Sequence, residues 1–202
     1  MDSIKLVAIL RGIRPAEAAE HVDTLISTGF RYIEIPLNSP DWQQSIPQMV
    51  ARFGGQATIG AGTVLKVEQV DFLAAAGAKL IVTPNTQPAV IRRAVAQGML
   101  VCAGCATATE AFTALDAGAQ WLKIFPSSAF GPAYIQALKA VLPPAVPVLA
   151  VGGVTPENLT TWIEAGCAGA GLGSDLYRAG QTAERTRQQA ERFMAASGAL
   201  VP

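Results

Sequence analysis

One short pattern recurs along this chain and limits the folds that it can adopt. An alanine-rich stretch with helical periodicity ends at a glycine, and a short apolar segment, often β-branched, begins shortly afterwards. The spacing is nearly constant in TGFRYIEI, AGAKLIVT, QGMLVCAG, AGAQWLKI and AGCAGAGL. Glycine is favoured at a helix end because it adopts the left-handed backbone conformation without steric cost. The pattern predicts a repeated helix–strand unit whose helices end at Gly29, Gly77, Gly98, Gly118 and Gly166.

The repeat divides the sequence into alternating strands and helices. The expected strands cover residues 6–11, 31–37, 58–64, 79–84, 99–104, 120–126, 146–152 and 168–174. The expected helices cover residues 15–28, 41–53, 66–76, 87–97, 107–117, 131–142, 156–165 and about 182–196. Helix starts carry matching signals: Pro15 follows a turn, Thr109-Glu110 fits a first turn, and Thr155-Pro156-Glu157 fits N-cap, N1 and N2.

This order of elements predicts the fold class. Strands that alternate with helices imply right-handed crossovers and a parallel sheet. The strands are near-continuous apolar runs, which is typical of a sheet with both faces covered. Eight such units predict a closed (β/α)8 TIM barrel that forms a single domain over residues 1–202. The alternative is a doubly wound open sheet, which would gather its ligand groups at one switch point rather than around a ring.

Composition narrows the class of protein. Half of the 202 residues are hydrophobic, 15% are charged and the formal net charge is zero. The apolar runs are far shorter than the ~18 residues that cross a bilayer, and no basic stripe suggests a nucleic-acid partner. The start, MDSIKLVAILRG, lacks a signal-peptide pattern, and three cysteines fit a reducing compartment better than a disulfide framework. We therefore expect a cytoplasmic protein with no membrane and no nucleic-acid partner.

Polar residues gather late in the expected strands or directly after them. Active sites of barrels of this type lie at the C-terminal ends of the strands, so these side chains are expected to converge there. The residues are Arg11, Glu34, Asn38, Thr63, Thr83-Pro84-Asn85, Lys123, Gly152-Gly153 and Gly173-Ser174. No other grouping of polar residues converges as well.

Lys123 and Glu34 are the pair with the clearest chemical meaning, because each interrupts an apolar strand. One interpretation is a structural ion pair inside the barrel, although such pairs add little stability over apolar packing. The other is catalysis. Burial lowers the pKa of a lysine, and a neutral amine attacks a carbonyl to form a Schiff base. A carboxyl in an apolar pocket has a raised pKa, so Glu34 is expected to serve as general acid/base.

Two glycine-rich turns follow the last two expected strands, in AVGGVTPEN and GLGSDLY. In many barrels these loops bind phosphate through backbone N–H groups, so we expect a phosphate site at Gly152-Gly153 and Gly173-Ser174. Arg11 and Thr63 are candidates for a second anion such as a carboxylate, since arginine binds one bidentately. A surface salt bridge is an equally good interpretation of Arg11 alone.

Metal and nucleotide sites are not predicted. Cys102 and Cys105 have zinc-like spacing, but only Cys167 and His21 remain as further ligands, and His21 is expected to face solvent on the first helix. The cysteines are interpreted as small buried apolar residues. No phosphate-binding G-x-x-x-x-G-K-[ST] loop and no dinucleotide fingerprint occur, so neither a metal nor a cofactor is expected.

Several stretches together resemble a known family. RYIEIPLNSP, IGAGTVL, LIVTPN, LKIFPSSAFGP, AVGGVTPENL and GLGSDLYR are similar, in order and over nearly the whole chain, to the class I 2-keto-3-deoxy-6-phospho-aldonate aldolases. The resemblance implies that Lys123 is the Schiff-base lysine and Glu34 the general acid/base. It also implies a cytoplasmic homotrimer without a metal. Its substrate would be a phosphorylated keto acid, cleaved to pyruvate and glyceraldehyde 3-phosphate.

One departure from the family pattern bears on the substrate. The gluconate-specific members carry an arginine four residues after the glutamate, in an E-V-T-L-R-T pattern, and here that position is Asn38. Arg11 is the expected substitute for holding the carboxylate, as in the galactonate members that this chain resembles most. The two substrates differ only at C4, and Val154 is expected to lie near that hydroxyl group.

The sequence also predicts two more residues that contact the substrate, and it leaves three other functions open. Pro84 and Phe125 are predicted to line the substrate site, with Phe125 against the pyruvyl carbons. The alternatives are activity on the gluconate epimer, a non-covalent phosphosugar epimerase that uses the same Lys/Glu pair, and a phosphosugar-binding protein without catalysis.

Overall fold

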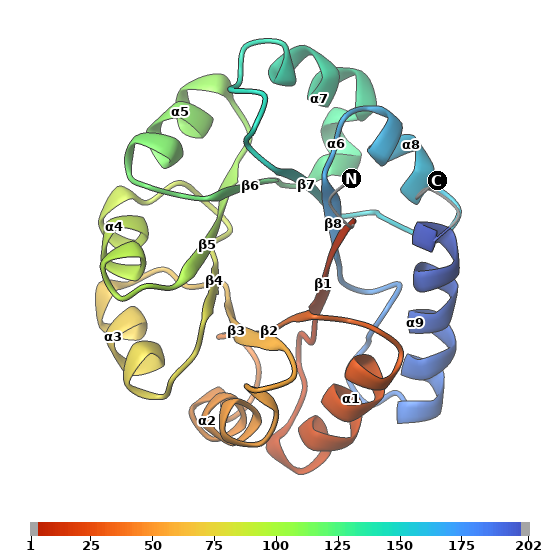
Figure 1. The fold of residues 1–202 in the computed structure, drawn as a ribbon. Helices are drawn as coiled ribbons and strands as arrows, with labels where there is room; N and C mark the ends of the chain where they lie inside the picture. Colours follow the sequence, from red (N-terminus) through yellow and green to blue (C-terminus); the bar gives the residue numbers. More distant parts are fainter. Residues whose placement is uncertain (1–3, 199–202) are drawn as a thin grey trace.

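A closed barrel of eight parallel strands forms the centre of the molecule in a computed structural model, which describes residues 4–198. Each strand is followed by a helix, and the helices form an outer ring around the barrel (Figure 1). The strands are β1 Lys5–Ile9, β2 Tyr32–Pro36, β3 Thr58–Gly62, β4 Leu80–Val82, β5 Leu100–Cys105, β6 Trp121–Ile124, β7 Val148–Val151 and β8 Gly169–Leu172. The helices are α1 Pro15–Ser27, α2 Trp42–Phe53, α3 Val67–Ala75, α4 Pro88–Ala96, α5 Ala108–Asp116, α6 Ser127–Phe130, α7 Pro132–Lys139, α8 Leu159–Glu164 and α9 Ala183–Gly198.

The strand pairing confirms the predicted (β/α)8 class. Val7 of β1 is paired with Tyr32 of β2 on one side and with Gly171 of β8 on the other. The first and last strands are therefore neighbours, which an open doubly wound sheet does not allow. The ends of the predicted domain, residues 1–3 and 199–202, lie outside the described residues.

The expected strands all form, and the helix-ending glycines behave as predicted. Each of these glycines has a positive φ, between 70° and 109°. They are Gly29, Gly77, Gly98, Gly118 and Gly166. The left-handed residue turns the chain from each helix toward the next strand, so the glycine spacing is a direct consequence of the barrel's repeat.

Two helix predictions differ from the structure. The expected helix 156–165 begins only at Leu159, because residues 156–158 form a turn. Thr155 and Asn158 close this turn: the Asn158 side chain accepts the N–H of Thr155 at 2.9 Å, and the Thr155 hydroxyl accepts the N–H of Asn158 at 3.3 Å. The expected helix 131–142 is the helix α7, which ends at Lys139, and the short helix α6 before it was not predicted.

Apolar side chains form two separate layers. The larger layer lies between the strands and the surrounding helices. The smaller one fills the barrel interior with side chains that alternate along the strands, as the period of a β-strand requires. This interior cluster consists of Val7, Ile9, Leu80, Val82, Cys102, Trp121, Leu149 and Val151. The interior is therefore packed below the level of the predicted site.

The prediction that His21 faces solvent is wrong. The His21 side chain is only 2% exposed, because α9 lies alongside α1 and covers that face (Figure 1). Its Nδ1 atom is hydrogen-bonded to the Thr186 hydroxyl at 2.8 Å, and its ring lies edge-on to Tyr177. Burial lowers the pKa of His21. This residue therefore joins the first and last helices.

The three cysteines are buried and free, as predicted. Burial raises the pKa of Cys102 to about 12, so its thiol is un-ionised at neutral pH. Within residues 4–198, no group of three or more His, Cys, Asp or Glu side chains is arranged to hold a metal ion.

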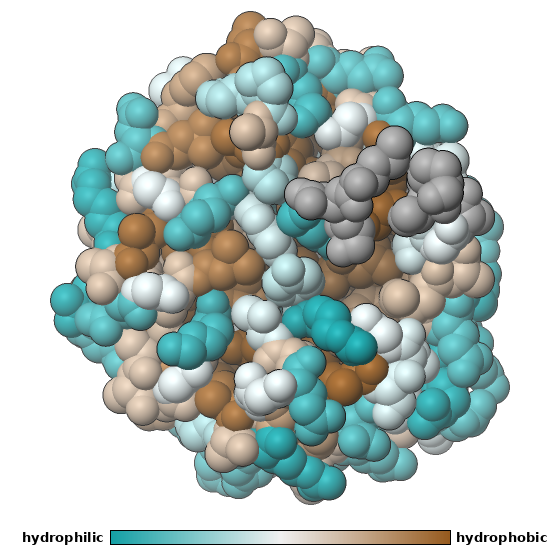
Figure 2. Space-filling model, viewed as in Figure 1, coloured by the Kyte–Doolittle hydropathy of each residue, from teal (hydrophilic) through white to brown (hydrophobic). Residues whose placement is uncertain are grey.

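The outer surface is mixed in character. Hydrophilic residues occupy most of the rim in the end-on view, with several separate hydrophobic areas between them (Figure 2). Among the described residues, no helix has the length and hydropathy that crossing a membrane requires. The helices thus turn an apolar face toward the barrel and a more polar face toward solvent.

Gly60→Ala should destabilise the barrel. Gly60 faces the interior, where an added Cβ would lie 1.8 Å from the carbonyl oxygen of Leu80 on the neighbouring strand. Backbone atoms of a paired strand cannot yield as a flexible side-chain end can, so we expect a loss of at least about 2 kcal/mol in the free energy of unfolding. Urea denaturation measures this loss.

Gly55→Ala is the matched control, since an added Cβ there meets no atom within 4 Å. Its free energy of unfolding should stay within about 0.5 kcal/mol of the wild type. Equal stability of the two variants would contradict the proposed close approach at Gly60.

Candidate active site

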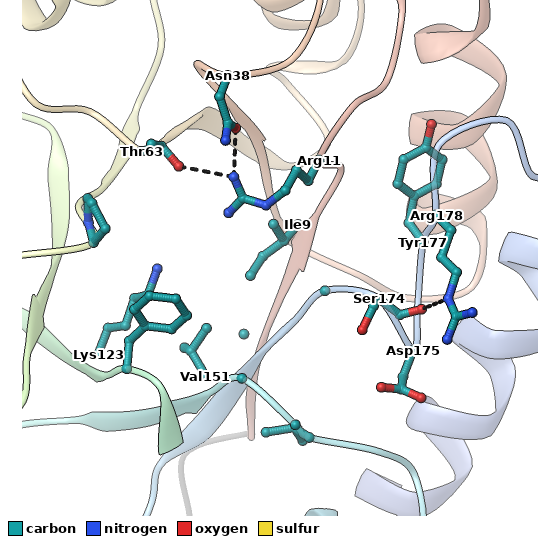
Figure 3. Close-up of a pocket in the computed structure, with 17 residues that line it drawn as sticks. Ile9, Arg11, Asn38, Thr63, Lys123, Val151, Ser174, Asp175, Tyr177 and Arg178 are labelled. Carbon is teal, nitrogen blue, oxygen red and sulfur yellow. Dashed lines mark hydrogen bonds between the residues drawn. The ribbon is translucent and has the colours of Figure 1, made fainter. Parts of the chain in front are cut away.

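A pocket of about 670 Å³ opens at the C-terminal ends of the strands. Its walls come from loops after strands that are distant in sequence, and Figure 3 shows their side chains facing a common space. The predicted site residues in its lining are Arg11, Thr63, Pro84, Lys123, Phe125, Gly152, Gly153, Val154, Gly173 and Ser174. The structure therefore brings these predicted residues together around one cavity.

Glu34 lies beneath this pocket rather than in its wall. A second cavity of about 10 Å³, lined by both Glu34 and Lys123, lies within the barrel interior. A cavity of this size accommodates about one water molecule, and its two polar side chains are suitable partners for one. The space between Glu34 and Lys123 is thus large enough for one water molecule that could carry a proton between them.

Lys123 comes from the middle of β6, where the pleat turns its side chain into the barrel. It is paired in register with Gly104 of β5 and Leu149 of β7, and it is only 4% exposed. Burial lowers the pKa of Lys123, although the charge of Glu34 opposes this shift. Its Nζ lies 4.8 Å from the centroid of the Phe125 ring. Burial thus makes the neutral amine more accessible than in a free lysine, although the Phe125 ring, like Glu34, favours the charged form.

Glu34 comes from β2, between Ile9 of β1 and Gly60 of β3, and is 1% exposed. Burial raises its pKa to about 7, against the opposing charges of Lys123 and Arg11. Its Oε2 atom is buried without a hydrogen-bond partner in the described part of the chain. The carboxyl group is therefore able to gain and lose a proton near neutral pH.

The space for the Glu34 carboxyl group depends on Gly62. This residue ends the neighbouring strand β3, where a Cβ would lie 2.0 Å from Glu34 Oε2. Any larger residue would displace the carboxyl group. The sequence motif IGAGTVL thus contains a glycine that the site itself requires.

Arg11 is held at one end of the pocket by two polar residues. Its Nη1 donates to Asn38 Oδ1 at 2.6 Å and lies 3.4 Å from Thr63 Oγ1 (Figure 3). Thr63 has a left-handed backbone with a φ of 55°. Arg11 forms no ion pair with another residue between 4 and 198. A guanidinium group held in this way is available for a carboxylate ligand.

The glycine-rich loops form the other side of the pocket. Gly152 and Gly153 both have positive φ values, of 97° and 75°, which a residue with a Cβ rarely adopts. The Gly152 carbonyl accepts the N–H of Ser128 at 3.1 Å, and the Gly153 carbonyl accepts the Asn158 side chain at 2.8 Å. These bonds hold the loop in place, and its backbone N–H groups are candidate donors to an anion.

Sequence reasoning gave no role to several lining residues. They are Ile9, Asn38, Val151, Gly171, Asp175, Tyr177 and Arg178. Asn38 was expected at this end of the barrel but without a ligand of its own, and the last three belong to GLGSDLYR, in which only Gly173 and Ser174 were predicted to bind phosphate. A search for inward alternation along β1, β7 and β8 would have found the apolar ones.

Comparison with known proteins assigns the family. The sequence model of the family "KDPG and KHG aldolase" matches residues 1–192. The chain is 70% identical, over 96% of its own length and 94% of the relative's, to 2-dehydro-3-deoxy-6-phosphogalactonate aldolase of Escherichia coli strain K12.

Two solved structures are also similar. One is described as "Native KDPGal structure", at 68% identity and a TM-score of 0.97, with 100% of this chain and 98% of that chain covered. The other is a cube-shaped protein cage designed by fusing symmetric oligomeric domains, at 68% identity and a TM-score of 0.97, with 98% and 73% covered. On this evidence, the chain belongs to the KDPG and KHG aldolase family.

Proposed function

We propose that this protein is a class I aldolase of galactonate degradation that cleaves 2-dehydro-3-deoxy-6-phospho-D-galactonate to pyruvate and D-glyceraldehyde 3-phosphate. The enzyme is a carbon–carbon lyase, as its 70% identity to the Escherichia coli enzyme of that activity supports. The main structural support for this chemistry is the buried pair of Lys123 and Glu34 at the floor of an open pocket. The pair places an amine and a carboxyl group, both with shifted pKa values, around one cavity.

Schiff-base formation begins the reaction. The neutral amine of Lys123 attacks the C2 ketone of the substrate and gives a carbinolamine. Glu34 passes a proton through the water in the small cavity to the departing hydroxyl group, and water leaves. The product of this step is a protonated imine, whose positive charge withdraws electrons from the adjacent carbon–carbon bond.

Bond cleavage uses the same carboxylate a second time. Glu34, now ionised, takes the proton of the C4 hydroxyl group, and the C3–C4 bond breaks with its electron pair moving to C3. Glyceraldehyde 3-phosphate departs and leaves an enamine on Lys123. Glu34 returns the proton to C3 through water, and hydrolysis of the resulting imine releases pyruvate and regenerates the free amine.

The pocket holds the two ends of the substrate apart. Arg11 and Thr63 bind the carboxylate of the pyruvyl half, and Phe125 packs against its carbons with Pro84 nearby. Fixing both ends aligns the C3–C4 bond with the acid/base, and such alignment supplies a large part of the rate enhancement of many enzymes.

The glycine-rich loops hold the leaving half of the substrate. Backbone N–H groups of Gly152, Gly153 and Gly173, with the Ser174 hydroxyl group, bind the phosphate. Val154 is buried beside this loop and lines the pocket, where it contacts the region of the C4 hydroxyl group and favours one epimer.

We further propose that the enzyme acts in the cytoplasm as a homotrimer, without a metal or cofactor. The designed cage of fused symmetric oligomeric domains, 68% identical to this chain, supports self-association. The electron sink of the reaction is the protonated imine on Lys123, so the mechanism requires no Lewis acid.

Pyruvate release from the two C4 epimers tests the function directly. The galactonate epimer should be cleaved with the higher kcat/KM, because the chain is 70% identical to the Escherichia coli enzyme named for that epimer and lacks, at Asn38, the arginine of gluconate-specific members. A coupled assay for pyruvate, with each epimer in turn, measures the ratio. Preference for the gluconate epimer would reverse the substrate assignment, and absence of pyruvate with either would refute the aldolase.

Borohydride reduction in the presence of pyruvate should add a stable adduct to the peptide that contains Lys123. Reduction traps the imine, and peptide mass spectrometry locates it. Lys123→Met should show no adduct and no cleavage. Lys79→Met, at an exposed lysine near the opposite end of the barrel, should retain both. An unlabelled Lys123 in an active enzyme would favour the non-covalent epimerase-type mechanism.

Glu34→Gln should lower kcat by about 10²–10⁴, the usual contribution of general acid/base catalysis. In the wild type, kcat should fall as the pH decreases below about 7, because burial raises the pKa of Glu34 to that value and acid protonates the carboxylate that must accept the C4 hydroxyl proton. Steady-state kinetics across the pH range measures both effects.

The matched control is Glu164→Gln, at an exposed glutamate on α8, which should leave kcat and its pH profile unchanged. A Glu34→Gln variant with wild-type kcat would remove Glu34 from the mechanism. A wild-type profile without an acidic limb would show that no such group titrates near neutrality.

A further inference from the structure

Arg178 lies in the pocket wall on the side of the β8 loop. It lines the same 670 Å³ pocket as Lys123 and follows Gly173 and Ser174 by only a few residues. Figure 3 shows Arg178 beside Ser174, across the pocket from Arg11. Its side chain is exposed at the pocket mouth, so a ligand entering the pocket can reach it.

One hydrogen bond fixes the orientation of this guanidinium group. Arg178 Nε donates to the carbonyl oxygen of Ser174 at 2.9 Å. The terminal Nη groups form no hydrogen bond or ion pair with any other residue that the structure describes. A guanidinium held through Nε presents its remaining N–H groups as a ready fork for a phosphate.

The backbone around Arg178 is also held in place. The N–H of Arg178 donates to Gln181 Oε1 at 3.0 Å, and Gln181 Nε2 donates to the carbonyl of Leu176 at 2.9 Å. Tyr177, the preceding residue, is buried and donates its hydroxyl proton to Glu17 Oε1 on α1 at 3.1 Å. The loop that carries Arg178 is thus already ordered before a ligand binds, so binding costs less conformational entropy.

Arg178 is one of only a few charged residues in the described pocket lining. Among the described lining residues, the cationic side chains are Arg11, Lys123 and Arg178, and Asp175 is an acid. Arg11 is bound at the far end by Asn38, and Lys123 becomes part of the Schiff base. The loop amides are neutral donors, so Arg178 is the cation of the lining that lies beside Ser174.

We propose that Arg178 is a specificity-determining residue that binds the phosphate of the leaving aldehyde half and makes the enzyme select phosphorylated substrates. The inference rests on the proposed aldolase function and extends it to a side chain outside the glycine-rich turns. A phosphate monoester carries a charge of about −1.5 to −2 at neutral pH, which a fixed guanidinium group recognises by charge and by geometry.

The test compares two reactions of the same enzyme. Arg178→Gln should raise KM for the phosphorylated six-carbon acid about tenfold, the effect of losing one charge-assisted hydrogen bond. Exchange of the C3 protons of pyruvate with deuterium, followed by NMR, uses Lys123 without a phosphate and should be unchanged. Arg178→Lys retains the charge without the fork and should recover part of the lost affinity.

Two further measurements separate a phosphate contact from a general effect. Arg185→Gln, at an exposed arginine on α9, is the matched control and should leave KM unchanged. Added salt should raise KM more steeply in the wild type than in Arg178→Gln, because salt screens an exposed ion pair.

The outcomes distinguish this inference from the function on which it rests. If the wild type cleaves the substrate and Arg178→Gln has the same KM, the role of Arg178 is overturned while the aldolase assignment stands. Equal losses in cleavage and pyruvate exchange would also overturn it, since they indicate a change in the whole site. If the wild type releases no pyruvate from either epimer, the aldolase assignment fails and this inference falls with it.

Discussion

The burial of one amine and one carboxyl group inside a closed barrel is the constraint on which the rest of the structure depends. Lys123 and Glu34 are almost fully inaccessible to solvent, and the apolar residues around them favour the neutral form of each. A buried pair of this kind contributes little to stability compared with apolar packing. In the proposed reaction, the desolvation that disfavours both charges prepares Lys123 as the nucleophile and Glu34 as the acid/base.

The interior glycines make this burial sterically possible. Gly62 leaves the space that the Glu34 carboxyl group occupies, and Gly60 lets β3 pack closely against the backbone of Leu80. Larger apolar side chains fill the interior below. The site is therefore a local interruption of a packed core, open above to a pocket whose two ends differ in chemistry. Arg11 with Thr63 lies at one end, and the glycine-rich loops lie on the other side.

Much of the fold and site followed from local patterns, and the errors have physical causes. The strands, the helix-ending glycines and many of the pocket-lining residues were predicted because each depends on a short sequence interval. His21 was misplaced because helical periodicity cannot show that α9 covers that face of α1. The start of α8 was misplaced because a Thr155–Asn158 turn resembles a helix cap. Arg178 received no role because nothing local indicates which way its guanidinium group points.

The sequence by itself determined which residue types form the site: a lysine and a glutamate in apolar strands, glycine-rich turns, and a repeat that favours a barrel. These features are local, and local features are encoded by residue type and spacing. Only the tertiary structure decided that Glu34 lies beneath the main pocket in a cavity shared with Lys123, and that Asn38 holds Arg11. Closure of the barrel sets these distances, and the depth of burial that closure creates sets the pKa shifts.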